Sequence, residues 1–158
     1  MIRAVLDTNV LASGALGLTG GMTPPALLLH QWRAGRFQLI ISDYIEKELR
    51  TTLAQPYFKR RIPSEDRELF LILLTKIAEH VAIRRRVTGV AMHPEDDPIL
   101  TTALSARADY LVTGDMRLRD RVPTFQGIPL VLPAEFLDIL TRESQLSTVS
   151  KAVMPRDL

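Results

Sequence analysis

Two aspartates occupy positions from which a carboxylate could bind a ligand. Asp7 directly follows the apolar run 2–6, and Asp115 follows the run 110–113 after one glycine. Parallel α/β sheets bind ligands just beyond the carboxyl ends of their strands, at the point where the strand order reverses. Each aspartate could instead cap the next helix, because its side-chain oxygens can accept hydrogen bonds from the first helical amides. For both residues the ligand-binding and the capping interpretations stay open.

Further acids could join these two. Three consecutive acids, Glu95-Asp96-Asp97, precede an expected helix, although one acid is enough to complement the helix dipole and three repel one another. Asp97 begins the apolar face of that helix, so we expect it to lean toward the sheet. Glu48 lies beside the apolar stripe of another expected helix, whereas we expect Glu46 to face water. An ordinary surface glutamate is the alternative for Glu48.

The elements that would position these acids alternate along the chain. Apolar runs without helical spacing predict strands at 2–6, 37–41, 81–84, 110–113 and 128–132. Capped or amphipathic segments predict helices over 10–15, 24–34, 43–54, 64–80, 97–107, 116–121 and 133–142. The alternation predicts an α/β domain over residues 1–142, with a parallel sheet covered on both faces. Residues 17–23 are expected to form a flexible loop and 143–158 a loosely held polar tail.

The composition is that of an ordinary globular protein. The chain has 158 residues, of which 46% are hydrophobic and 24% charged, and it contains no cysteine. One domain of this length can bury a full core. The lack of cysteine excludes a disulfide scaffold, a thiolate zinc site and a cysteine nucleophile. The longest apolar run, 69–74, is far shorter than a membrane span, so we expect a soluble, cytoplasmic protein.

Five segments, in this order and spacing, carry a resemblance to a known family. They are 5–11, 41–49, 95–100, 108–115 and 127–136. Together they resemble the PIN-domain nucleases, in particular the bacterial and archaeal VapC-like group described as toxins of toxin–antitoxin pairs. The resemblance covers about residues 1–140. It implies a three-layer α/β/α fold with a central parallel, twisted sheet.

The resemblance also implies a site. Its catalytic and metal-binding acids correspond to Asp7, Glu48, Asp97 and Asp115. Its supporting polar positions correspond to Asn9, Thr113 and Asp96. Each of the four acidic positions is filled by an acid, so the sequence gives no sign of an inactive copy. Glu48 is chosen over Glu46 because Leu49 follows it, as in the family pattern.

Four converging carboxylates indicate metal chemistry. Without a cation they would repel one another, and some would stay protonated. Oxygen ligands with no cysteine or nearby histidine favour Mg²⁺ or Mn²⁺ over zinc. One or two such ions activate water and neutralise phosphate oxygens during in-line attack. The residues thus indicate metal-dependent phosphate chemistry. The resemblance implies hydrolysis of RNA to 5′-phosphates, a cognate antitoxin, and a homodimer or higher homo-oligomer.

The charges are nearly balanced in number but not in their expected positions. The chain has 20 basic and 18 acidic residues, and if four acids face a metal, 14 acids remain against 20 basic residues. Arg117, Arg119 and Arg121 begin two residues after Asp115, so we expect this segment to contact the polyanionic substrate. The basic runs 59–61 and 84–86 are weaker candidates, since charge runs are usually solvated. With 6% aromatic residues, no stacking platform for bases is evident.

Two alternatives remain. A catalytically silent PIN-like domain would act as a binding module, with the apolar loop residues Leu16, Leu18 and Met22 and the long helix 65–80 as possible interfaces. A Mg²⁺-dependent phosphatase of the haloacid-dehalogenase type also begins with a strand that ends in aspartate. That family needs a second aspartate two residues later, where this chain has Asn9.

Overall fold

The fold is built around a six-stranded sheet in which all strands are parallel except one outermost strand. The computed structural model describes residues 1–83 and 97–153, apart from the side chains of Thr19, Asp97 and Val153. The strands are β1 (Arg3–Leu6), β2 (Gln38–Ile41), β3 (Glu79–His80), β4 (Tyr110–Val112), β5 (Thr124–Phe125) and β6 (Ile128–Val131). Their order in the sheet is β3-β2-β1-β4-β6-β5, and β5 pairs with β6 in the antiparallel direction. The predicted α/β fold with a central parallel sheet is confirmed.

The central strand, β1, marks the point where the strand order reverses. From β1 the chain builds β2 and β3 on one side, and it then returns to place β4 on the other side. In register, Val5 lies beside Ile40 of β2 and Leu6 beside Val112 of β4. These residues are buried and apolar, as expected for a parallel sheet that is covered on both faces. The crevice beyond the carboxyl ends of β1 and β4 is therefore the expected place for a ligand.

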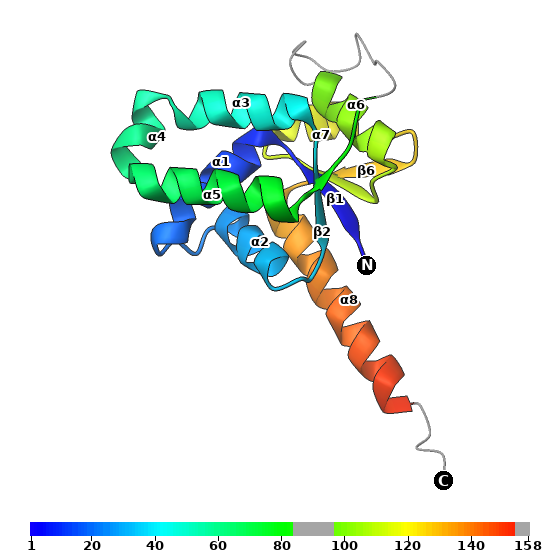
Figure 1. Ribbon diagram of the computed structural model, residues 1–158. Helices are drawn as coiled ribbons and strands as arrows, with labels where there is room; N and C mark the ends of the chain where they lie inside the picture. The colour runs from blue at the N-terminus through cyan, green and yellow to red at the C-terminus, as the bar shows by residue number, and fades with distance from the viewer. Residues whose placement is uncertain (84–96, 154–158) are drawn as a thin grey trace.

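Helices cover the sheet (Figure 1). They are α1 (Thr8–Leu16), α2 (Pro24–Arg33), α3 (Asp43–Leu53), α4 (Pro56–Arg61), α5 (Ser64–Ile77), α6 (Asp97–Ala106), α7 (Met116–Arg121) and α8 (Pro133–Val153). Helix α6 packs against β1 and β4, while α1 packs against α2 and α3. In the view of Figure 1, α3, α4 and α5 form a helical hairpin to the left of the strands labelled β1 and β2, and α6 lies to their right. No helix of the described residues is long and apolar enough to span a bilayer.

Local sequence explains how α1 and α2 are held beneath the site. Thr23 caps α2 by accepting a 3.5 Å hydrogen bond from the Ala26 amide, and Pro24 occupies the first turn. Glycines let α1 approach α2 closely, because a Cβ atom at Gly14 would lie 2.6 Å from Leu29 Cδ1. The close packing fixes α1 directly after β1, and with it the position of Asp7.

Several elements differ from the sequence-based expectations. The strand predicted at 81–84 is instead β3, although the Val81 amide still donates to Ile41 O at 3.0 Å. Its predicted last residue, Arg84, lies outside the described residues. Strand β5 and helix α4 were not predicted, because both are short. The expected loop 17–23 contains a 3₁₀ turn, Gly17–Thr19.

The predicted end of the last helix, at about residue 142, is wrong. Helix α8 continues to Val153, and residues 141–152 are exposed. The prediction followed the polar composition of this segment, but residues 143–152 contain no glycine or proline that would end a helix. Figure 1 shows this part of α8 extending away from the rest of the molecule.

Candidate active site

Two polar side chains lie side by side where the central strands end. Asp7 follows β1 and Thr113 follows β4, and both side chains are buried. The Asp7 amide donates to Val112 O at 2.8 Å, and the Thr113 amide donates to Val131 O at 3.0 Å. These bonds extend the ladder by one residue past each strand. The strand ends at which the strand order reverses thus carry a buried carboxylate and a buried hydroxyl.

A chain of hydrogen bonds fixes the Asp7 carboxylate. The Asp115 amide donates to Thr113 Oγ1 at 3.1 Å, and Thr113 Oγ1 donates to Asp7 Oδ2 at 3.0 Å. A hydroxyl has a single hydrogen, so its bond to Asp7 makes it an acceptor toward the Asp115 amide. Thr113 therefore joins the two aspartates and orients the first of them.

The capping interpretation applies to one aspartate and not to the other. Asp115 Oδ1 accepts from the amides of Arg117 and Leu118, at 3.0 and 3.1 Å, and so caps α7. Asp7 occupies the capping position of α1, but its side chain makes no capping hydrogen bond. Helix capping accounts for one oxygen of Asp115, whereas it does not explain why the Asp7 carboxylate is buried.

Glu48, on α3, has a buried carboxylate oxygen. Its Oε2 atom has no hydrogen-bond partner among the residues that the structure describes. A buried carboxylate oxygen without a donor or cation is unfavourable by at least ~1–3 kcal/mol. The other glutamate, Glu46, forms a 3.1 Å ion pair with Arg50. The two glutamates of α3 thus differ in their surroundings: Glu46 pairs with an arginine, whereas a Glu48 oxygen lacks a hydrogen-bond donor or cation in the described structure.

Two residues at strand ends were missed by the sequence analysis. Thr8 is fully buried, and its Oγ1 atom has no partner within the described parts of the chain. Ser42 follows β2 and is buried, and its Oγ atom lies 2.8 Å from Thr102 Oγ1 of α6. The available signal was a polar residue next to the end of an apolar strand, which was interpreted for Ser42 as capping alone.

Ser42 also connects α6 to this edge of the sheet. Thr102 Oγ1 donates to Pro98 O at 2.8 Å, so Ser42 is the donor in the hydroxyl pair. Asp97 is the first residue of α6, five residues before Thr102, and its side chain lies outside the described part of the structure. The N-terminal half of α6 is therefore tied to the end of β2, next to β1.

The remaining predicted site residues have varied positions. Asn9 is an exposed residue in the first turn of α1. Asp96 and the basic run 84–86 lie outside the described residues. Arg117 and Arg121 are exposed on α7, and no ion pair involving either is found in the ranges that the structure describes.

Arg119, the third predicted substrate contact, already binds two acids. It donates to Glu135 Oε2 at 2.8 Å and to Asp120 Oδ1 at 3.0 Å. Hydrogen bonds with Asp120 and then Glu135 raise the pKa of Arg119. The pKa of Glu135 is lowered, mainly because the Leu132 amide donates to it and further because Arg119 is close. A phosphate would have to compete with these carboxylates for Arg119.

A group of three possible ligands among the described residues lies at the ends of β2 and β3, apart from the predicted site residues. Asp43, Glu46 and His80 each offer one ligand atom, and these atoms lie within 4.8 Å of one another. His80 Nε2 lies 3.1 Å from Thr75 O, which leaves Nδ1 for the cluster. This group was not predicted, because His80 was expected at the end of the helix 64–80, whereas it ends β3.

The donor types of the predicted site suit a hard divalent cation. Asp7, Glu48 and Asp115 offer carboxylate oxygens, and Glu48 Oε2 is buried without a donor in the described structure. The group of ligand atoms within 4.8 Å of one another that the described residues contain includes none of these three. Mg²⁺ and Mn²⁺ prefer carboxylate oxygens. The residues present therefore fit a metal of this type.

A family model and a solved structure are similar to this chain. The PIN domain family matches residues 3–117, which is well over half of the chain. A solved structure, "Structure of the PIN domain endonuclease Utp24", is similar with a TM-score of 0.49 and 18% sequence identity, over 82% of this chain and 84% of that chain. A search of the curated proteins found no match. On the family match, this chain belongs to the PIN domain family.

Proposed function

We propose that this protein is an endoribonuclease that depends on Mg²⁺ or Mn²⁺ and cleaves RNA at the site of Asp7, Glu48, Asp97 and Asp115. PIN domains are generally nucleases, so the membership of this chain in the family supports a nuclease function. The observation that carries the proposal is the buried oxygen of Glu48, which lacks a donor in the described structure. A divalent cation would satisfy this oxygen, and in this proposal Glu48 lies beside the two aspartates that follow β1 and β4.

The residues have distinct roles in this proposal. A divalent ion bound there would activate water and neutralise phosphate oxygens. Asp7, fixed by Thr113, and the second oxygen of Asp115 would hold the ion, with Asp97 as a further ligand. Glu48 would be a ligand or would orient and deprotonate the water. Attack on phosphorus then breaks the bond to O3′, leaving a 5′-phosphate and a 3′-hydroxyl.

The test is cleavage of an unstructured RNA by the wild type and by Asp7→Asn. The proposal predicts cleavage with Mg²⁺ or Mn²⁺, no cleavage with a chelator, and loss of cleavage in the variant. Equal cleavage by both proteins would indicate a contaminating nuclease. If neither folded protein cleaves RNA in the presence of metal, the chain is a silent binding module.

The cellular role follows from the resemblance to VapC-like proteins. We propose a cytoplasmic toxin that acts as a homo-oligomer and binds a cognate antitoxin. Exposed apolar residues on α5, Leu69, Ile72 and Ile77, support a protein-binding surface. Induced expression should stop growth for the wild type and not for Asp7→Asn. Unchanged growth with soluble, active wild-type protein would contradict the toxin role.

A further inference from the structure

Helix α4 is a basic helix that connects α3 to α5. Residues 49–64 contain four basic residues, Arg50, Lys59, Arg60 and Arg61, and no acid. The three on α4 are exposed, and none forms an ion pair within the described structure. This group of positive charges matches the requirements of a polyanion.

An exposed aromatic ring lies among these charges. The side chain of Tyr57 is 49% exposed, and the guanidinium of Arg61 lies 3.7 Å from its ring centroid. Arg61 also donates to Tyr57 O at 2.9 Å, and Arg60 donates to Pro56 O at 3.2 Å. These bonds hold both guanidiniums against their own helix, while their other N–H groups remain available. Arg61 covers one face of the ring, and the Phe58 ring lies 5.1 Å away from it, centroid to centroid, at an angle of 77°. The exposed half of Tyr57 offers an aromatic surface to a base.

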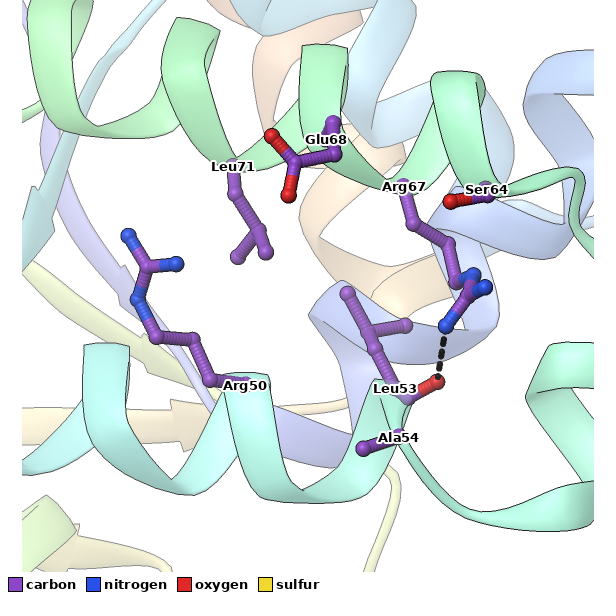
Figure 2. A pocket seen from close by; sticks show the side chains of 7 residues that line it. All are labelled: Arg50, Leu53, Ala54, Ser64, Arg67, Glu68 and Leu71. Carbon is purple, nitrogen blue, oxygen red and sulfur yellow. Dashed lines mark hydrogen bonds between the residues drawn. The ribbon is translucent and has the colours of Figure 1, made fainter.

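A pocket of about 90 Å³ lies next to α4, between α3 and α5 (Figure 2). Arg50 and Arg67 line it from opposite helices, together with Ser64 and Glu68. Arg67 Nη1 makes a long, 3.5 Å bond to Leu53 O, and its buried Nε has no acceptor in the described structure. A phosphate oxygen would supply that acceptor. Glu68 opposes an anion here, and Arg50 already forms an ion pair with Glu46. The pocket therefore adds to the basic helix and does not bind on its own.

We propose that α4 and the adjacent pocket form an accessory surface for single-stranded RNA, which holds the substrate strand beyond the cleavage site. Glu48 lies five residues before the end of α3, which is about 7.5 Å along the helix axis. A strand bound at the proposed metal site would therefore reach α4 within a few nucleotides. That this strand is then cleaved rests on the proposed function, whereas its binding to α4 does not.

The main test is a charge-neutralising variant, K59Q/R60Q/R61Q. Binding of a fluorescent, unstructured 20-nucleotide RNA is measured by anisotropy in metal-free buffer, so that the RNA stays intact. We expect the dissociation constant to rise at least about tenfold at moderate salt. The slope of log K against log salt should fall by about 2, since each lost phosphate contact contributes about 0.7 for a single strand.

A matched control removes the same charge from other elements. R33Q/R36Q/R142Q also neutralises three exposed arginines, two of which precede β2 while the third lies on α8. We expect its affinity for RNA to stay within about twofold of the wild type. Equal weakening by both triple variants would show a general effect of charge and would overturn the proposal, as would no weakening by the α4 variant.

The aromatic part of the proposal has its own test. Tyr57→Ala should weaken RNA binding about five- to tenfold, while Tyr57→Phe, which keeps the ring, should bind like the wild type. Thermal unfolding of each variant checks that α4 remains folded. A poly-glutamate peptide that binds as tightly as RNA, with the same dependence on Tyr57, would show that the surface recognises acidic protein and would overturn the proposal.

These results separate the two proposals. If the wild type cleaves RNA but the α4 variant binds RNA normally, the accessory surface is wrong and the nuclease function stands. If the wild type binds RNA through α4 but cleaves none, the surface stands and the nuclease function fails. If the wild type neither binds nor cleaves RNA, both are wrong.

Discussion

The acids at the two ends of the strands have different partners. At the edge where the strands begin, Arg3 forms two bonds with the Glu79 carboxylate, at 2.7 and 3.3 Å, and its amide donates to Asp109 Oδ2 at 2.8 Å. The same guanidinium donates to Ala106 O at 2.7 Å. At the edge where the strands end, the partners of Asp7 and Asp115 include a hydroxyl and backbone amides. No ion pair of Glu48 or Asp115 occurs in the ranges 1–83 and 97–153.

This difference distinguishes Glu79, which an arginine satisfies, from Glu48, whose buried Oε2 has no donor among the described residues. A bidentate pair with arginine satisfies a carboxylate within the protein, and a partly exposed pair contributes up to about 1 kcal/mol. Neighbouring carboxylates without a cation repel one another and are unfavourable until one binds. The comparison therefore predicts opposite effects when the acids at the two edges are neutralised.

The largest expected effect is on catalysis. Asp7→Asn should lower RNA cleavage by on the order of 1000-fold, about 4 kcal/mol of transition-state stabilisation, because the variant loses a metal ligand. The matched control is Asp109→Asn, the same change at the opposite edge, which should keep cleavage within about threefold. Initial rates at saturating Mn²⁺ measure both. Comparable losses in the two variants would remove the distinction between the edges.

Metal should also stabilise the fold through the same acids. At 100 times its dissociation constant, Mn²⁺ should add about 2.7 kcal/mol, which raises the Tm of a chain of this size by about 5–11 °C. Glu48→Gln should lose most of this shift and, without metal, should be at least as stable as the wild type. Glu79→Gln should keep the shift and lower the Tm in both conditions. Thermal scans with and without Mn²⁺ would measure this, and a full shift in Glu48→Gln would contradict the role of Glu48.

Thr113 tests whether the hydroxyl positions Asp7. Thr113→Val removes a donor to Asp7 and an acceptor for the Asp115 amide, so it should cost about 1–3 kcal/mol of stability. Cleavage should fall by about 10–100-fold, as for other residues that orient metal ligands. Thr113→Ser keeps the hydroxyl and should recover most of both. If serine recovers stability but not cleavage, the hydroxyl is not what orients the site.

The position of Asp7 at the end of a strand could be predicted from sequence, because the pattern that indicates it is local. An apolar strand followed at once by aspartate places the carboxylate at the strand end whatever the rest of the chain does, and Asp7 follows this rule. The pairing of Thr113 with Asp7 could not be predicted in the same way, because it depends on β1 lying next to β4 across 106 residues. Whether Glu48 reaches the aspartates, and how the side chains of Asp96 and Asp97 lie, stay predictions.

Short elements and long-range charge pairs were beyond the sequence analysis. Helix α4 has six residues and β3 has two, which is too short for a hydrophobic period to appear. Arg3 and Glu79 are 76 residues apart, and neither belongs to a motif. For Arg119, its position four residues after Asp115 indicated a substrate contact, but the fold places Glu135 beside it. Proximity in sequence to a site residue did not show which partner the fold supplies.

The smallest expected effect concerns Glu135, an ion-paired acid at the same edge as the site. Its pKa is lowered in the folded state, so it contributes stability above the ordinary pKa of glutamate and loses it as the pH falls through the lowered value. Because Glu135 and Arg119 are each more than a third exposed, this contribution should be at most about 0.5 kcal/mol. Urea unfolding should give Glu135→Gln a lower free energy of unfolding than the wild type at neutral pH, and this difference should disappear at acidic pH.

The Glu135→Gln variant should also keep its response to Mn²⁺, because an acid that already has an arginine needs no metal. Loss of the Mn²⁺ response would show that an acid's position at the strand ends decides whether it contributes to metal binding. Whether the acid already has a cationic partner would then not matter.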